Sequence, residues 1–278
     1  MSSIAIIPAR GGSKTIPQKN LSKVANVPLI QRAIDSAINA RSVGRVFVST
    51  DSDAIAAASI ERGAEIIWRP KELSGDSCTS ESAIKHAIDE IGWEGIVTFI
   101  QCTSPFIAPN KIDEAVTLVY ENLADSVFSA VLDHSFFWSM SESTAHPIGH
   151  SIAFREPRQL SDERIRETGA FYVFRTENFR RTGSRFHGRI APVLTEKLFA
   201  IDIDDHEDLQ LANYLSGWKQ QVTPEFKGVK AVVTDFDGVH TDNHLWVHQH
   251  GSELVRVNRA DGLGVNLLLS SGFDFLIL

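Results

Sequence analysis

Three cations and two glycines fall close together near the start of the chain, in the segment RGGSKTIPQKN at residues 10–20. The glycines, Gly11 and Gly12, allow a ligand to approach the backbone closely and can take positive φ angles. A glycine-rich turn that carries cations can cradle a triphosphate. The spacing fits neither the P-loop nor the dinucleotide fingerprint. An ordinary surface turn with solvated lysines is the alternative. The cations are Arg10, Lys14 and Lys19.

Two aspartates, Asp202 and Asp204, occur two residues apart in the segment IDIDD. We expect them at the end of a strand over residues 198–203, where alternate side chains share a face. Two converging carboxylates repel unless a cation lies between them. Mg²⁺ binds one or two protein carboxylates together with phosphate oxygens and water. The pair therefore indicates a site for Mg²⁺, or for Mn²⁺, with a solvated turn as the alternative, and we expect Asp205 to cap the helix that follows.

Strand-like and helix-like segments alternate through the first 130 residues. Short apolar runs predict strands at residues 4–7, 45–49, 96–100 and 126–131. Helical spacing predicts helices at residues 29–38, at residues 53–62 and after Pro109. This rhythm predicts an α/β fold with a mostly parallel sheet and helices on both faces. Ligands of such sheets bind at the carboxyl ends of strands, which here means the loops after Ile7, Ser49 and Ile100.

The alternation breaks over residues 132–168, where aromatic residues, prolines and polar residues mix. We expect this stretch either to cover the site or to reach a partner subunit. Strands are predicted at residues 170–174 and 198–203, and a helix at 205–215. Pro224 and Gly228 favour a linker. The sequence therefore predicts one domain over residues 1–218, a linker over 219–229 and a second unit over 230–278, which begins with a strand at 230–234.

The composition excludes several classes of function. The formal net charge is −8, which disfavours nucleic acid or an anionic membrane as the main partner. The two cysteines, Cys78 and Cys102, lack the spacing of metal ligands, so we expect reduced thiols in a cytoplasmic protein. The N-terminus lacks the basic start and cleavage site of a signal peptide. Apolar runs stay short of the ~20 residues that a membrane span needs.

Residues 10–20 resemble the opening signature of the CMP-sialic acid synthetases and their CMP-sugar relatives. Further segments resemble elements of that family in the same order: residues 49–51, Arg69-Pro70 with Leu73 and Asp76, residues 101–105, Arg158-Gln159, residues 166–172 and residues 202–209. The resemblance implies a nucleotidyltransferase (Rossmann-like) fold that transfers CMP from CTP to the anomeric hydroxyl of a sialic acid and releases pyrophosphate. Three positions depart from the family pattern: Thr15 replaces a glycine, Cys102 a proline and Thr168 an asparagine.

The resemblance also implies roles for individual residues. The nucleotide would bind to Arg10, Gly11, Gly12, Ser13, Lys14, Lys19, Asn20, Gln101, Thr103 and Ser104, and the metal to Asp202 and Asp204. Arg10, Lys19, Asp202 and Asp204 would carry catalysis by positioning and charge neutralisation. The sugar would contact Gln101, Arg158, Arg166 and Tyr172. A guanidinium suits the sugar carboxylate, and we favour Arg158 over Arg166, with a surface ion pair as the alternative for each.

The segment AVVTDFDGVHTDN after residue 230 resembles the first motif of haloacid-dehalogenase-type phosphatases, especially those that act on Kdo-8-phosphate. In that motif Asp235 would be the nucleophile and Asp237 the acid or base. The later motifs of such a domain would lie beyond residue 278, so we expect a fragment with a partial domain and no phosphatase activity. The nearby histidines, from His240 to His250, favour a polar loop or hairpin over a metal site.

Several alternatives stay open from the sequence. The sugar could be another acid, namely Kdn, Kdo, legionaminic acid or pseudaminic acid. The second unit could act in the full-length protein as a sugar-phosphate phosphatase or only as an assembly module. A CTP sensor without catalysis is a third possibility, against which the intact metal pair argues. We expect a homodimer or homotetramer.

Overall fold

The computed structural model describes residues 2–13, 15–75, 78–153, 163–221, 230–236, 239–247, 250, 253–257, 265–266, 268–269 and 273–278. The chain divides into two compact units, Met1–Lys219 and Gln220–Leu278. In the part of the chain described, no helix has both the length and the apolar character needed to cross a membrane.

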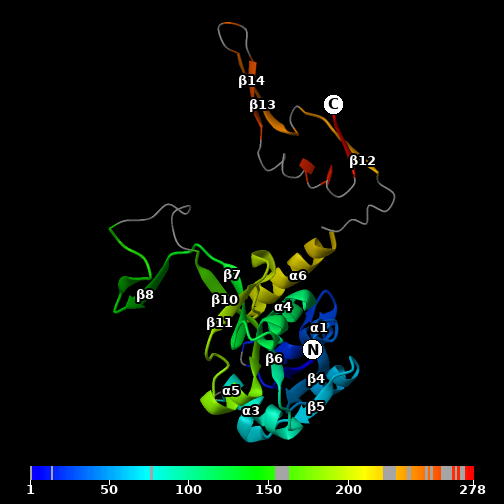
Figure 1. Ribbon diagram of the computed structural model, residues 1–278, viewed down its shortest axis with the longest axis vertical. Coiled ribbons are helices and arrows are strands. Elements are labelled where there is room, and N and C mark those ends of the chain that lie inside the picture. The colour runs from blue at the N-terminus through cyan, green and yellow to red at the C-terminus, as the bar shows by residue number, and fades with distance from the viewer. Residues whose placement is uncertain are drawn as a thin grey trace. The chain divides into compact units, whose positions relative to one another are not determined.

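A seven-stranded sheet forms the centre of the first unit (Figure 1), in the order β11-β7-β10-β6-β1-β4-β5. Neighbouring strands are parallel except that β10 runs antiparallel to both β6 and β7. The predicted α/β fold with a mostly parallel sheet is confirmed. The strands are β1 (Ser3–Pro8), β4 (Val43–Thr50), β5 (Glu65–Trp68), β6 (Ile96–Ile100), β7 (Ser126–Leu132), β10 (Ile165–Arg175) and β11 (Ile190–Leu194).

Helices cover both faces of this sheet because each presents an apolar stripe to it. One core joins strand side chains to helices α1 (Leu29–Ile38), α2 (Asp53–Ile60) and α4 (Pro109–Tyr120). A second core, on the other face, joins them to α3 (Ser80–Ile91) and α5 (Thr176–Thr182). The spacing that predicted α1 is the spacing of its buried residues Ile30, Ala33, Ile34 and Ala37. Each fully buried side chain of isoleucine size contributes about 1.5–3 kcal/mol.

Side-chain caps set where several helices begin. Thr79 caps α3 by accepting a hydrogen bond from the Ser82 amide at 3.2 Å. Asp205 precedes α6 (His206–Gln221), and its Oδ1 accepts from the amides of Glu207 and Asp208 at 2.9 and 3.0 Å. The predicted cap at Asp205 is therefore confirmed. Helix α6 continues to Gln221, into the first residues of the predicted linker.

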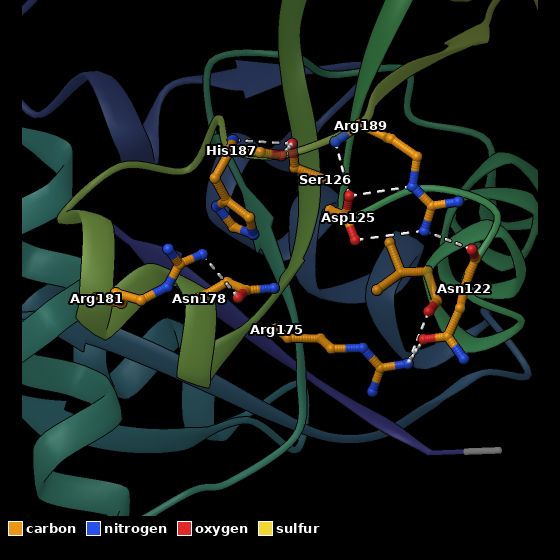
Figure 2. Close-up of polar contacts among 9 residues, drawn as sticks. Asn122, Asp125, Ser126, Arg175, Asn178, Arg181, His187 and Arg189 are labelled. Carbon is orange, nitrogen blue, oxygen red and sulfur yellow. Dashed lines mark hydrogen bonds and ion pairs between the residues drawn. The ribbon is translucent and has the colours of Figure 1, made fainter.

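An arginine-rich cluster ties the end of α4 to the sheet (Figure 2). The Arg175 guanidinium donates to Asn122 Oδ1 at 3.0 Å, and the Arg189 guanidinium donates to the Asn122 carbonyl at 2.6 Å. The Arg189 amide also donates to Asp125 Oδ2 at 2.7 Å. Gly188 has a φ of +59°, and a Cβ there would lie 2.5 Å from Asp125 Oδ2. This close approach requires glycine.

The stretch in which the alternation breaks contains a two-stranded antiparallel hairpin, seen in green around β8 in Figure 1. Its strands are β8 (Phe137–Ser141) and β9 (Thr144–Ile148). Apolar side chains of the hairpin are exposed, among them Trp138 and Met140. Residues 154–162, which contain Arg158 and Gln159, lie outside the described residues.

The strand predicted at residues 198–203 is wrong. A 3₁₀ helix, η3 (Lys197–Phe199), occupies its start, and residues 200–204 belong to neither helix nor strand. The strand lies earlier, at β11, which contains Pro192; a proline is tolerated there because β11 is an edge strand. Strand β5 and helix α3 were not predicted from the sequence.

In the second unit, β12 (Ala231–Thr234) pairs in parallel with β15 (Asp274–Ile277). A separate antiparallel pair consists of β13 (Thr241–Val247) and β14 (Glu253–Val257). Asp235 directly follows β12, whereas Asp237 lies outside the described residues.

Candidate functional site

A cleft of about 410 Å³ lies at the carboxyl ends of β1, β5 and β6, where each strand gives way to a loop. The loops predicted after Ile7 and Ile100 both line it, and the segment at residues 202–204 completes the wall. The loop after Ser49 supports the cleft indirectly, because its Asp51 accepts a hydrogen bond from the glycine turn. The predicted site residues that line the cleft are Arg10, Gly12, Ser13, Lys19, Asn20, Gln101, Thr103, Asp202 and Asp204.

Two hydrogen bonds to neighbouring loops hold the glycine turn in place. The Gly11 amide donates to Asp51 Oδ1 at 2.8 Å, and Asn20 Nδ2 donates to the Arg10 carbonyl at 3.0 Å. Neither Gly11 nor Gly12 has a positive φ, so that part of the prediction is wrong. A Cβ on Gly11 would lie 3.0 Å from Ser52 Cβ at the start of α2. Glycine is therefore needed at this position for close approach. Lys14 lies outside the described residues.

The cationic loop and the aspartate segment are bonded directly to each other. Lys19 Nζ donates to the Ile203 carbonyl at 2.8 Å and lies 3.2 Å from Asp204 Oδ1. The Thr15 hydroxyl donates to the Asp204 carbonyl at 2.7 Å. These partners are 184 to 189 residues apart in sequence. The departure from the family pattern at Thr15 thus supplies one of the bonds that join the two segments.

Asp202 faces the same part of the cleft as Gln101. Both approach Gly169, where a Cβ would lie 3.4 Å from Gln101 Oε1 and 3.7 Å from Asp202 Oδ2. Asp202 is exposed to solvent, yet partial desolvation by the cleft walls raises the pKa of its carboxyl, and the charge of nearby Asp204 raises it further. The strand geometry expected for the pair is absent, yet both carboxylates line one cleft.

Two cleft carboxylates fit the needs of Mg²⁺, because phosphate oxygens and water fill its remaining positions. A cluster of three or more histidine, cysteine, aspartate or glutamate side chains suited to a metal does not occur among the described residues. Of the histidine stretch, His240 bonds the Thr234 hydroxyl at 2.8 Å, and His248 lies outside the described residues.

Several predicted residues are not among the described residues that line this cleft. Arg166 pairs with Asp133 at 3.2 Å. The Tyr172 phenol is buried and donates to the Glu167 carboxylate, and burial raises the pKa of the phenol. Ser104 lines a smaller cavity of about 90 Å³. Of the four predicted sugar contacts, Gln101 lines the cleft and Arg158 lies outside the described residues.

Arg69, which was not among the predicted site residues, lines the cleft and is only 8% exposed. Its Nε donates to Ser49 Oγ at 3.1 Å and its Nη2 to the Ser49 carbonyl at 2.6 Å. Burial lowers the pKa of the guanidinium, and the charge of Asp51 opposes that shift. The pair Arg69-Pro70 could have indicated a site residue, because it directly follows β5 and ligands bind at the carboxyl ends of strands. Strand β5 was not predicted, so this signal was not used. The start of α3 was missed with it, and its residues Thr79 and Ser80 also line the cleft.

Residues 4–181 match the family model described as Cytidylyltransferase. The chain is 31% identical over 281 residues to N-acylneuraminate cytidylyltransferase A of Danio rerio, covering 99% of this chain and 65% of that protein. It is 30% identical to N-acylneuraminate cytidylyltransferase of Oncorhynchus mykiss, covering 99% and 64%. For the protein of that name in Streptococcus agalactiae serotype V, the identity is 32% over 215 residues, covering 75% and 52%. The chain thus spans less than two thirds of the length of these curated relatives.

Solved structures share the fold. The structure of CMP:2-keto-3-deoxy-manno-octonic acid synthetase complexed with CTP has a TM-score of 0.60 at 16% identity, covering 79% of this chain and 100% of that one. The 4-diphosphocytidyl-2C-methyl-D-erythritol synthase of Anaerococcus prevotii DSM 20548 has a TM-score of 0.56 at 15% identity, covering 77% and 96%. At these identities the likeness concerns the arrangement of the sheet and its helices.

Proposed function

The chain belongs to the cytidylyltransferase family, and from that premise we propose that it transfers CMP from CTP to the anomeric hydroxyl of a sialic acid, an N-acylneuraminate. The products are CMP-sialic acid and pyrophosphate. The names of the curated relatives, N-acylneuraminate cytidylyltransferases, support this choice of sugar.

One observation carries the proposal: a cationic glycine turn and two aspartates line the same cleft, although they are far apart in the sequence. A triphosphate needs positive charge and amide donors. A divalent ion needs carboxylates. The bonds from Lys19 and Thr15 to the segment around Asp204 bring both kinds of group within reach of one ligand.

The residues of the chain have distinct roles in this reaction. Arg10 and Lys19 offset the charge of the phosphates, and the glycine turn approaches them closely. Gln101 offers an amide that can donate and accept at once, which suits a cytosine edge or a sugar hydroxyl. The anomeric oxygen attacks the α-phosphorus, the bond to the pyrophosphate oxygen breaks, and the hydroxyl proton passes to solvent. Holding these groups in line accounts for most of the rate, because little covalent work falls to the protein.

We propose that Asp202 and Asp204 hold Mg²⁺, or Mn²⁺ in its place. When bound, the ion would supply positive charge against the phosphate oxygens. Besides desolvation, the charge of Asp204 is one of the causes that raise the pKa of Asp202, and a cation between the two carboxylates would offset this repulsion. Lys19 is next to Asp204, so its ammonium adds to the positive charge at this end of the cleft.

The test is pyrophosphate release with CTP, Mg²⁺ and a panel of acid sugars. We expect N-acetylneuraminate to give the highest kcat/KM. A higher kcat/KM with Kdn, Kdo, legionaminic acid or pseudaminic acid would support the transfer of CMP but refute sialic acid as the sugar. Pyrophosphate release with none of them, from protein that binds CTP, would reduce the chain to a CTP-binding protein and refute the proposal.

For the second unit, we propose the start of a haloacid-dehalogenase-type domain. The parallel pair β12–β15, with Asp235 at the carboxyl end of β12, supports it, because that motif places its nucleophile after a strand. In a longer protein this domain would act as a sugar-phosphate phosphatase or as an assembly module. Phosphate release from sugar phosphates, compared between such a protein and its Asp235→Asn variant, separates the two roles.

We also propose that the chain forms a homodimer or homotetramer. The hairpin β8–β9 exposes Trp138, Met140 and Ile148, which are 42%, 80% and 52% exposed. Apolar side chains gathered in this way favour contact with another protein surface. Light scattering that gives the mass of one chain at micromolar concentration would contradict the proposal.

A further inference from the structure

Arg185 lies between α5 and β11 and contacts three elements at once. Its Nε donates to Glu81 Oε1 at 2.7 Å, in the first turn of α3. Its guanidinium carbon lies 4.5 Å from the ring centre of Tyr172, in β10, and 5.0 Å from that of Phe99, in β6. One side chain therefore joins a helix start to two neighbouring strands.

These contacts are more shielded from solvent than those of an ordinary surface arginine. The side chains of Arg185 and Glu81 are 16% and 30% exposed. In every other ion pair between residues of the described ranges, at least one partner is more than 30% exposed. A pair with little solvent around it keeps more of its attraction. The two rings stack at 5.5 Å, so the guanidinium meets a continuous aromatic surface.

Each partner of Arg185 adjoins a wall of the cleft. Glu81 directly follows residues 79–80, which line the cleft. Phe99 lies in β6, two residues before Gln101, which directly follows the end of this strand and lines the cleft. The α3 wall and the β6 wall of the cleft are thus connected through Arg185.

Tyr172 connects the same guanidinium to the strand that borders the cleft near Asp202. Burial and the hydrogen bond to Glu167 raise the pKa of its phenol, the charge of Asp202 raises it further, and the charge of Arg185 opposes the shift. Asp202 in turn lies beside Gly169, three residues before Tyr172 on the same strand. Arg185 is not among the described residues that line the cleft, so it would act through its partners.

We propose that Arg185 is a positioning residue, which fixes the wall at residues 79–80 against the wall at Gln101 at the spacing that the nucleotide requires. This inference rests on the proposed function, because it takes CTP as the ligand of the cleft. Without the guanidinium, the start of α3 loses its ion pair and the two rings lose their cation. The two walls then vary in spacing, and part of the binding energy of CTP is spent on ordering them.

The test compares Arg185→Met with Arg180→Met. Arg180 is a matched control because it also pairs with α3, through Asp89 at 3.4 Å, but at the end of the helix away from the cleft. Calorimetric titration with CTP and Mg²⁺ should give a Kd about tenfold higher for Arg185→Met and an unchanged Kd for the control. In turnover, KM for CTP should rise while kcat stays within about twofold. Arg185→Lys keeps a cation for Glu81 but lacks the planar group that stacks on the rings, so its Kd should lie between.

Hydrogen exchange of the nucleotide-free protein gives a second measurement that does not depend on CTP. Amides of residues 79–82 and 101–104 should exchange faster in Arg185→Met than in the wild type or in Arg180→Met. If the wild type fails to bind CTP, the proposed function is refuted while the exchange comparison still decides whether Arg185 orders the two walls. Unchanged exchange in Arg185→Met, or a loss of CTP affinity that Arg180→Met shares, would overturn the inference.

Discussion

Asp204→Ala separates chemistry from folding. The Asp204 side chain is 77% exposed, and its ion pair with Lys19 is 3.2 Å long. Exposed pairs of this kind contribute about 0–1 kcal/mol to stability. Lys19 would keep its 2.8 Å bond to the Ile203 carbonyl, and Thr15 its bond to the carbonyl of residue 204, because the acceptor of each bond is a backbone oxygen that the substitution leaves in place. The variant should therefore unfold with a free energy within about 1 kcal/mol of the wild type.

Activity should respond far more strongly. Removing one group that stabilises transition-state charge typically costs a factor of about 10²–10³ in kcat, or about 3–4 kcal/mol. The assay is pyrophosphate release with CTP, N-acetylneuraminate and saturating Mg²⁺, beside urea unfolding of the same preparation. Glu207→Ala is the matched control, because it removes an exposed carboxylate from the start of the adjacent helix. Turnover of Asp204→Ala within threefold of the wild type would refute the assignment of the metal site.

Three further changes have distinct expected results. Because the folded-state pKa of Asp202 is raised, the native state keeps its proton to higher pH than the unfolded chain does, and stability falls as pH rises from the unfolded pKa through the folded one. Asp202→Asn should remove that fall, which solvent keeps small because Asp202 is exposed, and should abolish turnover without lowering Tm at pH 7 in the absence of metal; a lower Tm would contradict this. Gly188→Ala should lower the free energy of unfolding by at least about 2 kcal/mol, since φ is +59° and a Cβ would overlap Asp125; urea midpoints within error of the wild type would disagree. Arg69→Ala should raise the Kd for CTP at least about tenfold, because a buried cation leaves the cleft wall; unaltered calorimetric affinity would exclude Arg69 from the nucleotide site.

Local patterns in the sequence predicted most of the sheet. Short apolar runs predicted β1, β4, β6 and β7, and apolar residues at helical spacing predicted α1 and α4. The strand β5 was missed because EIIW is short, lies beside the Arg69-Pro70 turn and ends in a Trp68 that is 56% exposed. The strand predicted at residues 198–203 was wrong because its apolar run is short and irregular. There the Ile203 amide donates to the Thr103 carbonyl, without the repeated bonds of a strand ladder.

Contacts between residues far apart in the sequence limited how much of the candidate site could be predicted. Type and spacing were enough to single out Arg10, Lys19 and the two aspartates, which line one cleft. Spacing could not reveal that Arg166 forms an ion pair with Asp133, which is 33 residues earlier. Nor could it reveal that Arg185 reaches Glu81, which is 104 residues away. Such partners are determined by the order of strands in the sheet, and one sequence carries no direct signal of that order.

The central claim is that one nucleotide lies between the glycine turn and a divalent ion held by two aspartates. Anomalous diffraction from crystals grown with CTP and Mn²⁺ tests it directly. We predict a manganese peak within coordination distance of Asp202 and Asp204, with triphosphate density that reaches Arg10 and Lys19. A manganese peak elsewhere, or a triphosphate that leaves the glycine turn uncovered, would contradict the account.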